Sequence, residues 1–539
     1  MRRLITAGIC ALLLTGCGGT QGNPTQTSGP AQKTEKSQTA ATAPEAPETP
    51  QPQGPAPVEG ISKKDTAEAK QIVEKMSDEE LAGSVLMMTY QGTDPQVAAD
   101  TIKRLHLSGS IVMTYNLGDA ATFEDLKATT SAIKAGGKDR DWPVLTSVDQ
   151  EGGPVARVRS ATMPFPPLMA GGAVRNKDTV TNATHAQGAE LRDAGFSIDF
   201  APVADVTVGA KDPAINVRSA GDKSDAVSDT VVAAVNGYSK AGIGSAAKHF
   251  PGHGSLTVDS HESLPVSKKS LKKLSKTEFE PFRKAAEVGV PLVMVGHIAV
   301  PGNEKLPGDL NPEVYEALRK DVGFEHVAVT DALNMGAVTQ KDAALAAIKA
   351  GADLALMPHD IEQAHASIVK AVKSGDLSRE RITEAATRVV ALSLWQKRSA
   401  ETAKGSAPKP EGALRAYAEE SLSVVRGACE VATPLKQARV VGDDEVAVQG
   451  LSEAFENNGV SVGSGPTVSV GQKAASGAEY VVGIGAPWNV DRAKADTVIA
   501  TYTGNEYAMD AVAKYLTGEL EATAQVPVKV RGKSPTCGK

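Results

Sequence analysis

The chain has 539 residues, of which 41% are hydrophobic and 22% are charged, and its formal net charge is -7. This composition is typical of soluble globular proteins, and the length leaves room for more than one domain. The negative charge argues against a nucleic-acid-binding protein, because such proteins need a strongly basic surface.

The first 17 residues have the pattern of a lipoprotein signal segment. Arg2 and Arg3 provide a positive start, residues 4–14 an apolar stretch, and Leu14-Thr-Gly-Cys17 a small-residue cleavage site. The apolar stretch is too short to span a bilayer comfortably. Leu-Thr-Gly-Cys resembles the lipobox of bacterial lipoproteins, in which the cysteine is lipidated. We therefore expect an exported protein that lipid on Cys17 anchors to the bacterial cell membrane, facing outward. An ordinary secreted protein is the alternative.

Residues 18–60 predict a disordered tether. They are rich in Pro, Thr, Gln, Ala and Ser and contain almost no large apolar side chain. Such a segment cannot bury enough surface to offset the entropy lost on ordering. We expect this segment to act as a spacer that holds the folded part away from the membrane.

Two cysteines, Cys429 and Cys537, belong to the folded part, because Cys10 would leave with the signal segment. An exported protein meets an oxidising compartment, in which a bridge between the two can form. The sequence does not give the distance between them, so the disulfide stays an open question at this point.

Eight short apolar runs follow the tether, with helix-like stretches between them. The runs are residues 84–90, 108–115, 143–149, 196–206, 243–249, 291–300, 326–331 and 352–357, and the helix-like stretches include 65–81, 226–240, 269–288 and 361–373. Eight buried strands alternating with helices predict an α/β fold, a (β/α)8 barrel of the TIM type over residues 61–400. A doubly wound sheet is the alternative.

Polar residues at the ends of several runs favour the barrel, because barrel active sites lie at the carboxyl ends of the strands. These residues are Asp149, Glu151, Asp205, Lys248, His249, His297 and Asp331.

A composition shift near residues 399–411, where Lys, Pro, Gly and Ser form a linker, ends the predicted barrel. Beyond it, residues 438–442, 480–485 and 496–502 predict strands, and residues 506–516 predict a helix. Residues 411–539 are therefore expected to form a smaller C-terminal α/β domain.

The most informative stretch is Lys248-His-Phe-Pro-Gly-His-Gly-Ser-Leu-Thr-Val-Asp-Ser-His261, a glycine-rich loop that follows a predicted strand. Asp259 can fix the tautomer of His261 and tune it as a base, as carboxylate–histidine pairs do elsewhere. The alternative is a zinc site made by His249, His253 and His261 with Asp259. Their spacing matches none of the common zinc patterns, so no metal and no cofactor is expected.

Asp331 ends the apolar run 327–331, where a carboxylate can act as a nucleophile or stabilise cationic charge. A helix N-cap is the alternative role. Asp149 begins the motif Asp149-Gln-Glu-Gly-Gly153, and Arg157 follows it. Arg218 lies in a second motif, Asn216-Val-Arg-Ser-Ala-Gly221. Carboxylate and guanidinium groups together can grip sugar hydroxyls, although each alone is more often a solvated surface charge.

The joint order of four motifs resembles the exo-β-N-acetylglucosaminidases of glycoside hydrolase family 3, over roughly residues 63–394. The motifs are Asp149-Gln-Glu-Gly-Gly, Asn216-Val-Arg-Ser, the stretch from Lys248 to His261, and Val329-Thr-Asp-Ala-Leu-Asn-Met-Gly336. Residues 496–528 look like the smaller C-terminal domain of that family. Many relatives read Gly-Asp-Thr where this chain has Gly254-Ser-Leu256, a difference that can alter loop closure.

The resemblance implies a retaining double displacement. Asp331 would attack the anomeric carbon, and His261, paired with Asp259, would protonate the leaving oxygen and then activate water. A histidine in this role departs from the usual pair of carboxyl groups. The resemblance also implies that five residues contact the non-reducing N-acetylglucosamine: Asp149, Arg157, Arg218, Lys248 and His249.

The implied function is removal of terminal β-linked N-acetylglucosamine from cell-wall fragments or related glycans, by a protein that we expect to be a monomer. Three alternatives stay open. The first is a phosphorylase, since histidine in place of a carboxylate would repel phosphate less. The second is a β-glucosidase. The third is a catalytically inert, glycan-binding surface lipoprotein.

Overall fold

The computed structural model describes residues 60–539 except 119, 257, 534, 536 and 538–539. The predicted signal segment, Cys17 and nearly all of the predicted tether lie outside the described residues. Within the described part of the chain, no helix is both long and apolar enough to cross a membrane.

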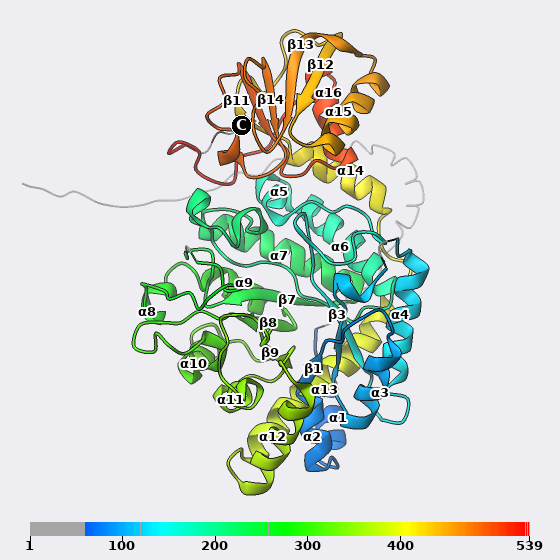
Figure 1. Ribbon diagram of the computed structural model, residues 1–539, viewed down its shortest axis with the longest axis vertical. Coiled ribbons are helices and arrows are strands. Elements are labelled where there is room, and N and C mark those ends of the chain that lie inside the picture. The colour runs from blue at the N-terminus through cyan, green and yellow to red at the C-terminus, as the bar shows by residue number, and fades with distance from the viewer. Residues whose placement is uncertain (1–59, 119, 257, 534, 536, 538–539) are drawn as a thin grey trace, which may run out of the picture. The chain divides into compact units, whose positions relative to one another are not determined.

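The larger sheet is a parallel barrel (Figure 1). Its eight strands lie in the order β10-β1-β2-β3-β6-β7-β8-β9, every paired neighbour is parallel, and a parallel bridge between Val329 and Leu354 links the two end strands. The strands are β1 Leu86–Met88, β2 Gly109–Ile111, β3 Leu145–Val148, β6 Ile198–Asp199, β7 Gly244–Phe250, β8 Leu292–Val295, β9 Val327–Thr330 and β10 Ala355–Leu356. Each predicted apolar run matches one of them, with β7 extending one residue beyond its run, so the predicted (β/α)8 barrel is confirmed.

Two of the four predicted helices are single helices, and two are divided. Residues 226–240 lie in α7 Ser224–Ala241, and 361–373 in α12 Ile361–Ser374. The stretch 65–81 instead contains the end of one helix and the start of another, because Ser77 forms a capping box with Glu80. The stretch 269–288 divides into α8 Leu271–Leu274 and α9 Glu280–Glu287, with a proline in the first turn of α9.

The remaining helices that follow or flank the barrel strands complete this part of the fold. They are α1 Lys63–Val73, α2 Asp78–Ser84, α3 Gln96–Leu105, α4 Phe123–Ala135, α5 Leu168–Ala173, α6 Lys177–Asp193, α10 Pro312–Lys320, α11 Ala343–Ala350 and α13 Arg379–Thr402.

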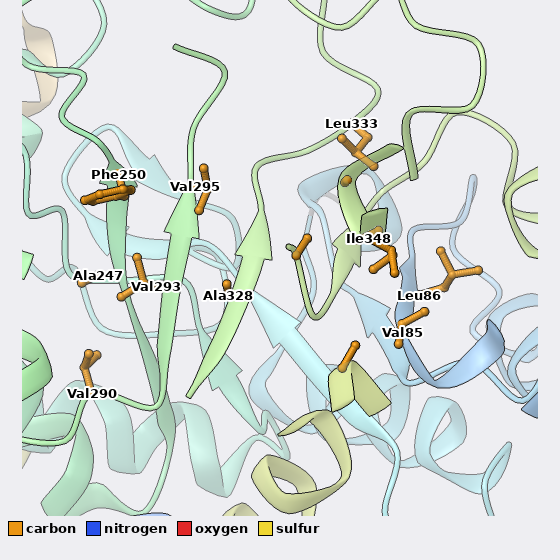
Figure 2. Packing of buried hydrophobic residues seen from close by; sticks show 14 of the residues in the cluster. Val85, Leu86, Ala247, Phe250, Val290, Val293, Val295, Ala328, Leu333 and Ile348 are labelled. Atoms are coloured by element: carbon orange, nitrogen blue, oxygen red, sulfur yellow. The ribbon is translucent and has the colours of Figure 1, made fainter. Parts of the chain in front are cut away.

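The barrel strands alternate their side chains between two apolar layers. On β8, Leu292 and Met294 belong to a buried cluster that takes residues from all eight strands, which places this cluster inside the barrel. Val293 and Val295 belong to a second cluster, which also contains helix residues (Figure 2). Burying each such side chain contributes about 1.5–3 kcal/mol, so a one-residue shift of a strand would be costly.

The C-terminal part contains a five-stranded sheet with the order β11-β15-β14-β13-β12, in which β11 is antiparallel to β15. Its strands are β11 Ser423–Arg426, β12 Gln437–Gly442, β13 Ser461–Gly471, β14 Tyr480–Gly483 and β15 Thr497–Ala500, and its helices are α14 Pro410–Ser421, α15 Glu445–Asn457 and α16 Glu506–Thr517. The predicted smaller α/β domain and its predicted elements are confirmed.

The sequence-based prediction missed several of these elements. The first half of β13 is rich in Ser and Gly and has no apolar run, so nothing in it indicated a strand. The predicted linker was too long at both ends. Helix α13 continues to Thr402 with Ser399 fully buried, and α14 begins at Pro410, so the connection between the helices is residues 403–409.

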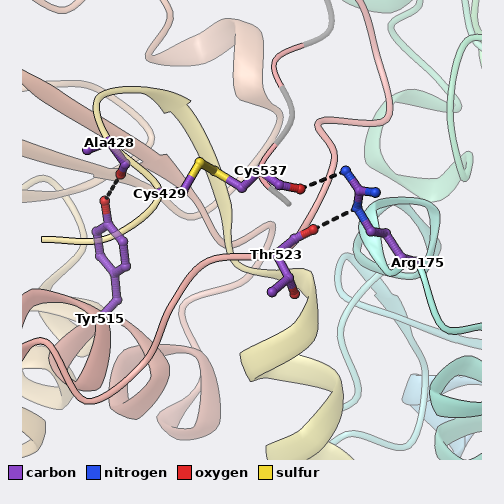
Figure 3. The surroundings of a disulfide bond; sticks show 6 residues. All are labelled: Arg175, Ala428, Cys429, Tyr515, Thr523 and Cys537. Atoms are coloured by element: carbon purple, nitrogen blue, oxygen red, sulfur yellow. Dashed lines mark hydrogen bonds between the residues drawn. A yellow bond between two sulfur atoms is a disulfide. The ribbon is translucent and has the colours of Figure 1, made fainter. Parts of the chain in front are cut away.

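The structure joins Cys429 to Cys537, with their Cα atoms 5.5 Å apart (Figure 3). The bridge holds the C-terminal tail beside β11, and Arg175 binds the same tail by donating from Nη2 to the carbonyl oxygen of Cys537 at 2.6 Å and from Nε to that of Thr523 at 2.8 Å. The sequence left open whether Cys429 and Cys537 are bridged, and the structure shows that they are.

Replacing both cysteines by serine should lower the stability of the C-terminal part, because the bridge closes a loop with a sequence separation of 108 residues. Loss of such a bridge typically costs about 2–5 kcal/mol. Thermal unfolding, monitored with and without reductant, checks this. Reductant should lower the melting temperature of the wild type and leave that of the double variant unchanged; equal melting temperatures for all samples would contradict the prediction.

Candidate active site

A cavity of about 330 Å³ opens at the carboxyl ends of the barrel strands, and it collects the residues predicted from the sequence. All eight of the predicted catalytic and substrate-binding residues line it: Asp149, Arg157, Arg218, Lys248, His249, Asp259, His261 and Asp331. Their chemical roles stay predictions, but the structure places them around one space.

A buried network of ion pairs forms one wall of the cavity. Lys248 Nζ lies 2.8 Å from Asp149 Oδ1 and 2.7 Å from Glu151 Oε1. Arg218 binds Glu151 with two nitrogens, Nε at 2.7 Å and Nη2 at 2.8 Å. The side chains of Lys248 and Glu151 are only 2% and 4% exposed. Burial alone would raise the pKa of Glu151, but the charges of Arg218 and Lys248 hold it well below its usual range.

Glu151 was noted as a strand-end residue but was not among the predicted site residues. Its position depends on the two glycines that follow it. Gly152 has φ +88°, and a Cβ there would lie 2.4 Å from the carbonyl oxygen of Pro166. The short hairpin of β4 Gln150–Gly152 and β5 Val155–Ala156 therefore needs glycine to bring the carboxylate under the cavity.

Asp205, fully buried after β6, orients the histidine loop. One carboxylate oxygen accepts from His249 Nδ1 at 2.7 Å, and the other accepts from the backbone N–H of His253 at 2.6 Å. With Nδ1 paired, His249 presents Nε2 to Arg218 Nη2 at 3.3 Å. Burial would raise the pKa of Asp205, but the charge of His249 and its hydrogen bond lower it. Asp205 therefore sets the direction of the His249 ring.

His253 is 3% exposed, and neither of its ring nitrogens has a partner in the described part of the chain. Burial lowers its pKa to about 4, so the ring is neutral at pH 7.

Asp331 follows β9 and holds an ionised carboxylate at the cavity. Its Oδ1 accepts from the backbone N–H of Ala332 at 2.8 Å. Burial alone would raise the pKa of Asp331, but the charges of His297 and His249 and the hydrogen bond from Ala332 lower it to about 2. The N-cap role is wrong, because the next helix, α11, begins only at Ala343 and is preceded by Asp342.

His297, paired with Asp309, binds the residue that follows Asp331. Both side chains are fully buried, with His297 Nδ1 2.9 Å from Asp309 Oδ1, and His297 Nε2 donates to the carbonyl oxygen of Ala332 at 2.9 Å. Burial would lower the pKa of His297, but Asp309 raises it to about 9. A positive charge therefore stays beside Asp331 at neutral pH. Asp309 lies outside the apolar runs, and nothing in the sequence pointed to it.

Asp259 and His261 form the predicted pair at the rim. His261 Nδ1 lies 2.8 Å from Asp259 Oδ1, and the His261 side chain is 59% exposed. With Nδ1 held by the carboxylate, Nε2 is left to exchange a proton with a ligand or water. Burial would raise the pKa of Asp259, but the hydrogen bonds and charge of His261 lower it.

Gly336 brings the Asp331 loop against the His261 loop. A Cβ at Gly336 would lie 2.8 Å from the carbonyl oxygen of His261 and 3.0 Å from that of Glu262. Only a residue without a side chain permits this approach, so the last glycine of the Asp331 motif has a packing role between the two loops.

The outer part of the cavity contains residues that sequence reasoning did not select. Tyr115 is 41% exposed and shares a 2.8 Å hydrogen bond with Thr89. Gln91, Met113, Asn334 and Met335 also line the cavity. Asn334 and Met335 belong to the Asp331 motif, but no role was predicted for them, whereas Gln91 and Met113 lie outside the four motifs. The folded barrel brings all four residues together.

Within residues 60–539, apart from the positions that the structure leaves out, no three His, Cys, Asp or Glu side chains are grouped so that they could hold a metal ion. The alternative zinc site of His249, His253, His261 and Asp259 is not formed. Asp205 occupies Nδ1 of His249, and Asp259 pairs with Nδ1 of His261.

Comparison with known proteins gives a family match over more than half of the chain. The model described as "Glycosyl hydrolase family 3 N terminal domain" matches residues 76–392. Beta-hexosaminidase A of Pseudoalteromonas piscicida is 31% identical over 333 residues, which is 56% of this chain and 55% of that protein. The chain thus spans about half the length of this relative.

Two further proteins are covered almost completely. A beta-hexosaminidase of Alkalilimnicola ehrlichii is 30% identical over 349 residues, or 61% of this chain and 98% of that one. A solved glycoside hydrolase family 3 beta-N-acetylglucosaminidase from Paenibacillus sp. is 27% identical with a TM-score of 0.71, covering 84% of this chain and 99% of the other.

Replacing Lys248 by methionine should destabilise the protein strongly, because Asp149 and Glu151 lose the ammonium group that both contact. Breaking a buried ion pair on one side costs about 3–5 kcal/mol. The matched control is Lys103→Met, which breaks an ion pair with Asp139 whose side chains are 66% and 74% exposed and should change little. Urea unfolding of both variants checks the difference; equal small losses would contradict the structural role of the network.

Proposed function

Because the chain belongs to glycosyl hydrolase family 3, we propose that it hydrolyses terminal β-linked N-acetylglucosamine from cell-wall fragments or related glycans. One observation carries the proposal: an ionised carboxylate, Asp331, shares a cavity with a histidine–carboxylate pair, His261 and Asp259. Relatives described as beta-hexosaminidases, and a solved beta-N-acetylglucosaminidase with the same fold, support this substrate class.

In the first step, Asp331 attacks the anomeric carbon. Its low pKa keeps the carboxylate ionised, and the N–H of Ala332 holds Oδ1, which leaves the second oxygen for the attack. As the carbon–oxygen bond to Asp331 forms, the bond to the leaving group breaks. His261 in its protonated form gives its proton to the leaving oxygen.

In the second step, the now neutral His261 takes a proton from water, and the water oxygen attacks the anomeric carbon and releases Asp331. Two displacements at one carbon retain its configuration. Asp259 keeps Nδ1 of His261 occupied, so that Nε2 performs both proton transfers. The exposure of His261 fits a group that must meet both a leaving group and bulk water.

The buried network binds and orients the sugar. Lys248, Arg218 and Asp149 present donors and acceptors to the cavity, and their mutual ion pairs fix them before a ligand arrives. Hydroxyl groups held by such fixed partners align the ring for attack by Asp331, at less entropic cost than with flexible side chains. Arg157 lines the same cavity, and its buried Nε has no protein partner within the described residues.

We also propose that the chain acts outside the cell, anchored by lipid on Cys17. The support is the Leu14-Thr-Gly-Cys17 pattern after an apolar segment. In cells that express the full chain, the wild type should carry radioactive palmitate and sediment with membranes, whereas Cys17→Ser should do neither. Equal labelling of both would contradict the anchor.

Replacing His261 by alanine should slow substrates with poor leaving groups by about 10²–10⁴-fold, because these need a proton on the departing oxygen. A dinitrophenyl N-acetylglucosaminide needs no such help and should lose much less. Asp331→Ala should abolish turnover of both. The exposed His359→Ala serves as the control and should keep wild-type rates. Equal losses for the two leaving-group classes in His261→Ala would contradict the acid role.

The His261→Ala variant also gives a pH test. With the dinitrophenyl substrate, kcat/KM should stay level as the pH falls from 7 to about 4. The reason is that Asp331, with a pKa of about 2, remains ionised over this range. A loss of activity as the pH falls through this range would contradict the proposal, because Asp331 is expected to stay ionised there.

Product analysis in phosphate buffer separates the alternatives. Free N-acetylglucosamine as the product supports the hydrolase. N-acetylglucosamine 1-phosphate would instead identify a phosphorylase, and preferential cleavage of the β-glucoside would identify a β-glucosidase. A folded protein that binds N-acetylglucosaminides but turns over neither glycoside would be a binding protein.

A further inference from the structure

A second cavity, of about 380 Å³, lies at the opposite end of the barrel from Asp331. Its walls include Trp142 and Phe196, which come just before strands β3 and β6, whereas the catalytic candidates come after strands. The last turn of α4, with Lys134, and the C-terminal half of α13, with Gln396, complete the walls. The cavity is therefore separate from the proposed active site.

The lining of this cavity is strongly cationic. Five cations line it, namely Lys134, Lys138, Arg140, Arg192 and Lys397, against two carboxylates, Asp141 and Glu401. Glu401 is already paired with Lys404 at 2.7 Å, and Arg192 with Asp193 at 2.7 Å. Among the described residues, no side-chain hydrogen bond or ion pair is formed by Lys134, Lys138 or Lys397.

Arg140 lines the cavity and is held in place by its neighbours. Its guanidinium carbon lies 3.4 Å from the centre of the Trp142 ring, and its nitrogens donate only to backbone carbonyls, including that of Leu107 at 2.6 Å. These partners hold the side chain in place but carry no full negative charge. Burial lowers the pKa of Lys134 to about 8, and it lowers that of Arg140 as well.

Gln396 adds a neutral polar group to the same space. It is 5% exposed, and its side-chain amide has no hydrogen-bond partner within the described part of the chain. Neither amide atom is among the described side-chain atoms that are fully buried without a partner, so the amide is open to the cavity and can bind an occupant there. The amide can donate two hydrogen bonds beside the free ammonium groups.

We propose that this cavity binds a small oxyanion of the phosphate class. Lys134 and Lys397 would contact it as point charges, Gln396 would donate to a third oxygen, and the stacked Arg140 would supply fixed positive charge beneath it. An anion would offset the cost of holding Lys134 and Arg140 partly away from water without a carboxylate. The site needs no part of the catalytic residues.

The test measures thermal unfolding in potassium phosphate and in potassium chloride of equal ionic strength. The variant is the double substitution Lys134→Met and Lys397→Met, and the matched control is Lys370→Met with Lys436→Met, two exposed lysines outside the cavity. Phosphate should raise the melting temperature of the wild type and the control by several degrees, and leave the double variant at its chloride value.

Two results would overturn the proposal. One is equal stabilisation of the double variant by phosphate, which would place the anion elsewhere, including at the cationic wall of the proposed active site. The other is no stabilisation of the wild type relative to chloride. In chloride, the double variant should be at least as stable as the wild type, because Lys397 is exposed, Lys134 is only partly buried, and neither forms an ion pair that the substitutions would break. Its glycosidase activity should be unchanged, so failure here and failure of the proposed function are distinguishable.

A measurement on the wild type avoids dependence on a folded variant. Brief acetylation with acetic anhydride, followed by peptide mass spectrometry, should label Lys134 at least threefold less in phosphate than in chloride. Labelling of Lys370 should be the same in both buffers. Equal labelling of Lys134 in the two buffers would overturn the proposal.

Discussion

The buried pairing of Lys248 with Asp149 and Glu151, completed by Arg218, is the constraint on which the site depends. A charge at 2% exposure cannot be left without a partner, so the loop after β3, the end of strand β7 and the turn that carries Arg218 must meet at one point. A buried ion pair of this kind need not add to the overall stability of the protein, but it holds these segments in one arrangement. Asp205 does the same for the histidine loop, since three donors converge on its two oxygens.

The two catalytic candidates differ in how they are held. Asp331 follows a buried strand, the N–H of Ala332 binds its carboxylate, and His297, paired with Asp309, holds the Ala332 carbonyl, so the barrel sets its position. His261 lies on an exposed loop, held by Asp259 and by the close approach of Gly336. A rigid nucleophile and an accessible proton carrier suit a reaction in which the sugar stays in place while the leaving group and the water exchange.

Much of this arrangement was predictable because the strands of a parallel barrel all end on the same side, so residues at the strand ends come together. Each apolar run predicted a strand, and polar residues at the end of a run were therefore expected at the same end of the barrel, where Asp149, Lys248 and Asp331 lie. Residues placed by tertiary contacts were not predictable. Asp309 pairs with His297 across two loops, and the Ser- and Gly-rich start of β13 becomes a strand only through its pairing with β12. The cationic cavity combines α4, the residues before β3 and α13, which are distant in the chain, and no motif marks it.

The most direct test of the account is to trap the covalent intermediate. A fluorinated N-acetylglucosaminyl fluoride, which reacts quickly with a nucleophile and is released slowly, should add the mass of one sugar to the protein. Peptide mass spectrometry should then place the sugar on the peptide that contains Asp331, and Asp331→Ala should take up none. A sugar attached to any other residue, or steady turnover of this reagent with no adduct at early times, would contradict the account.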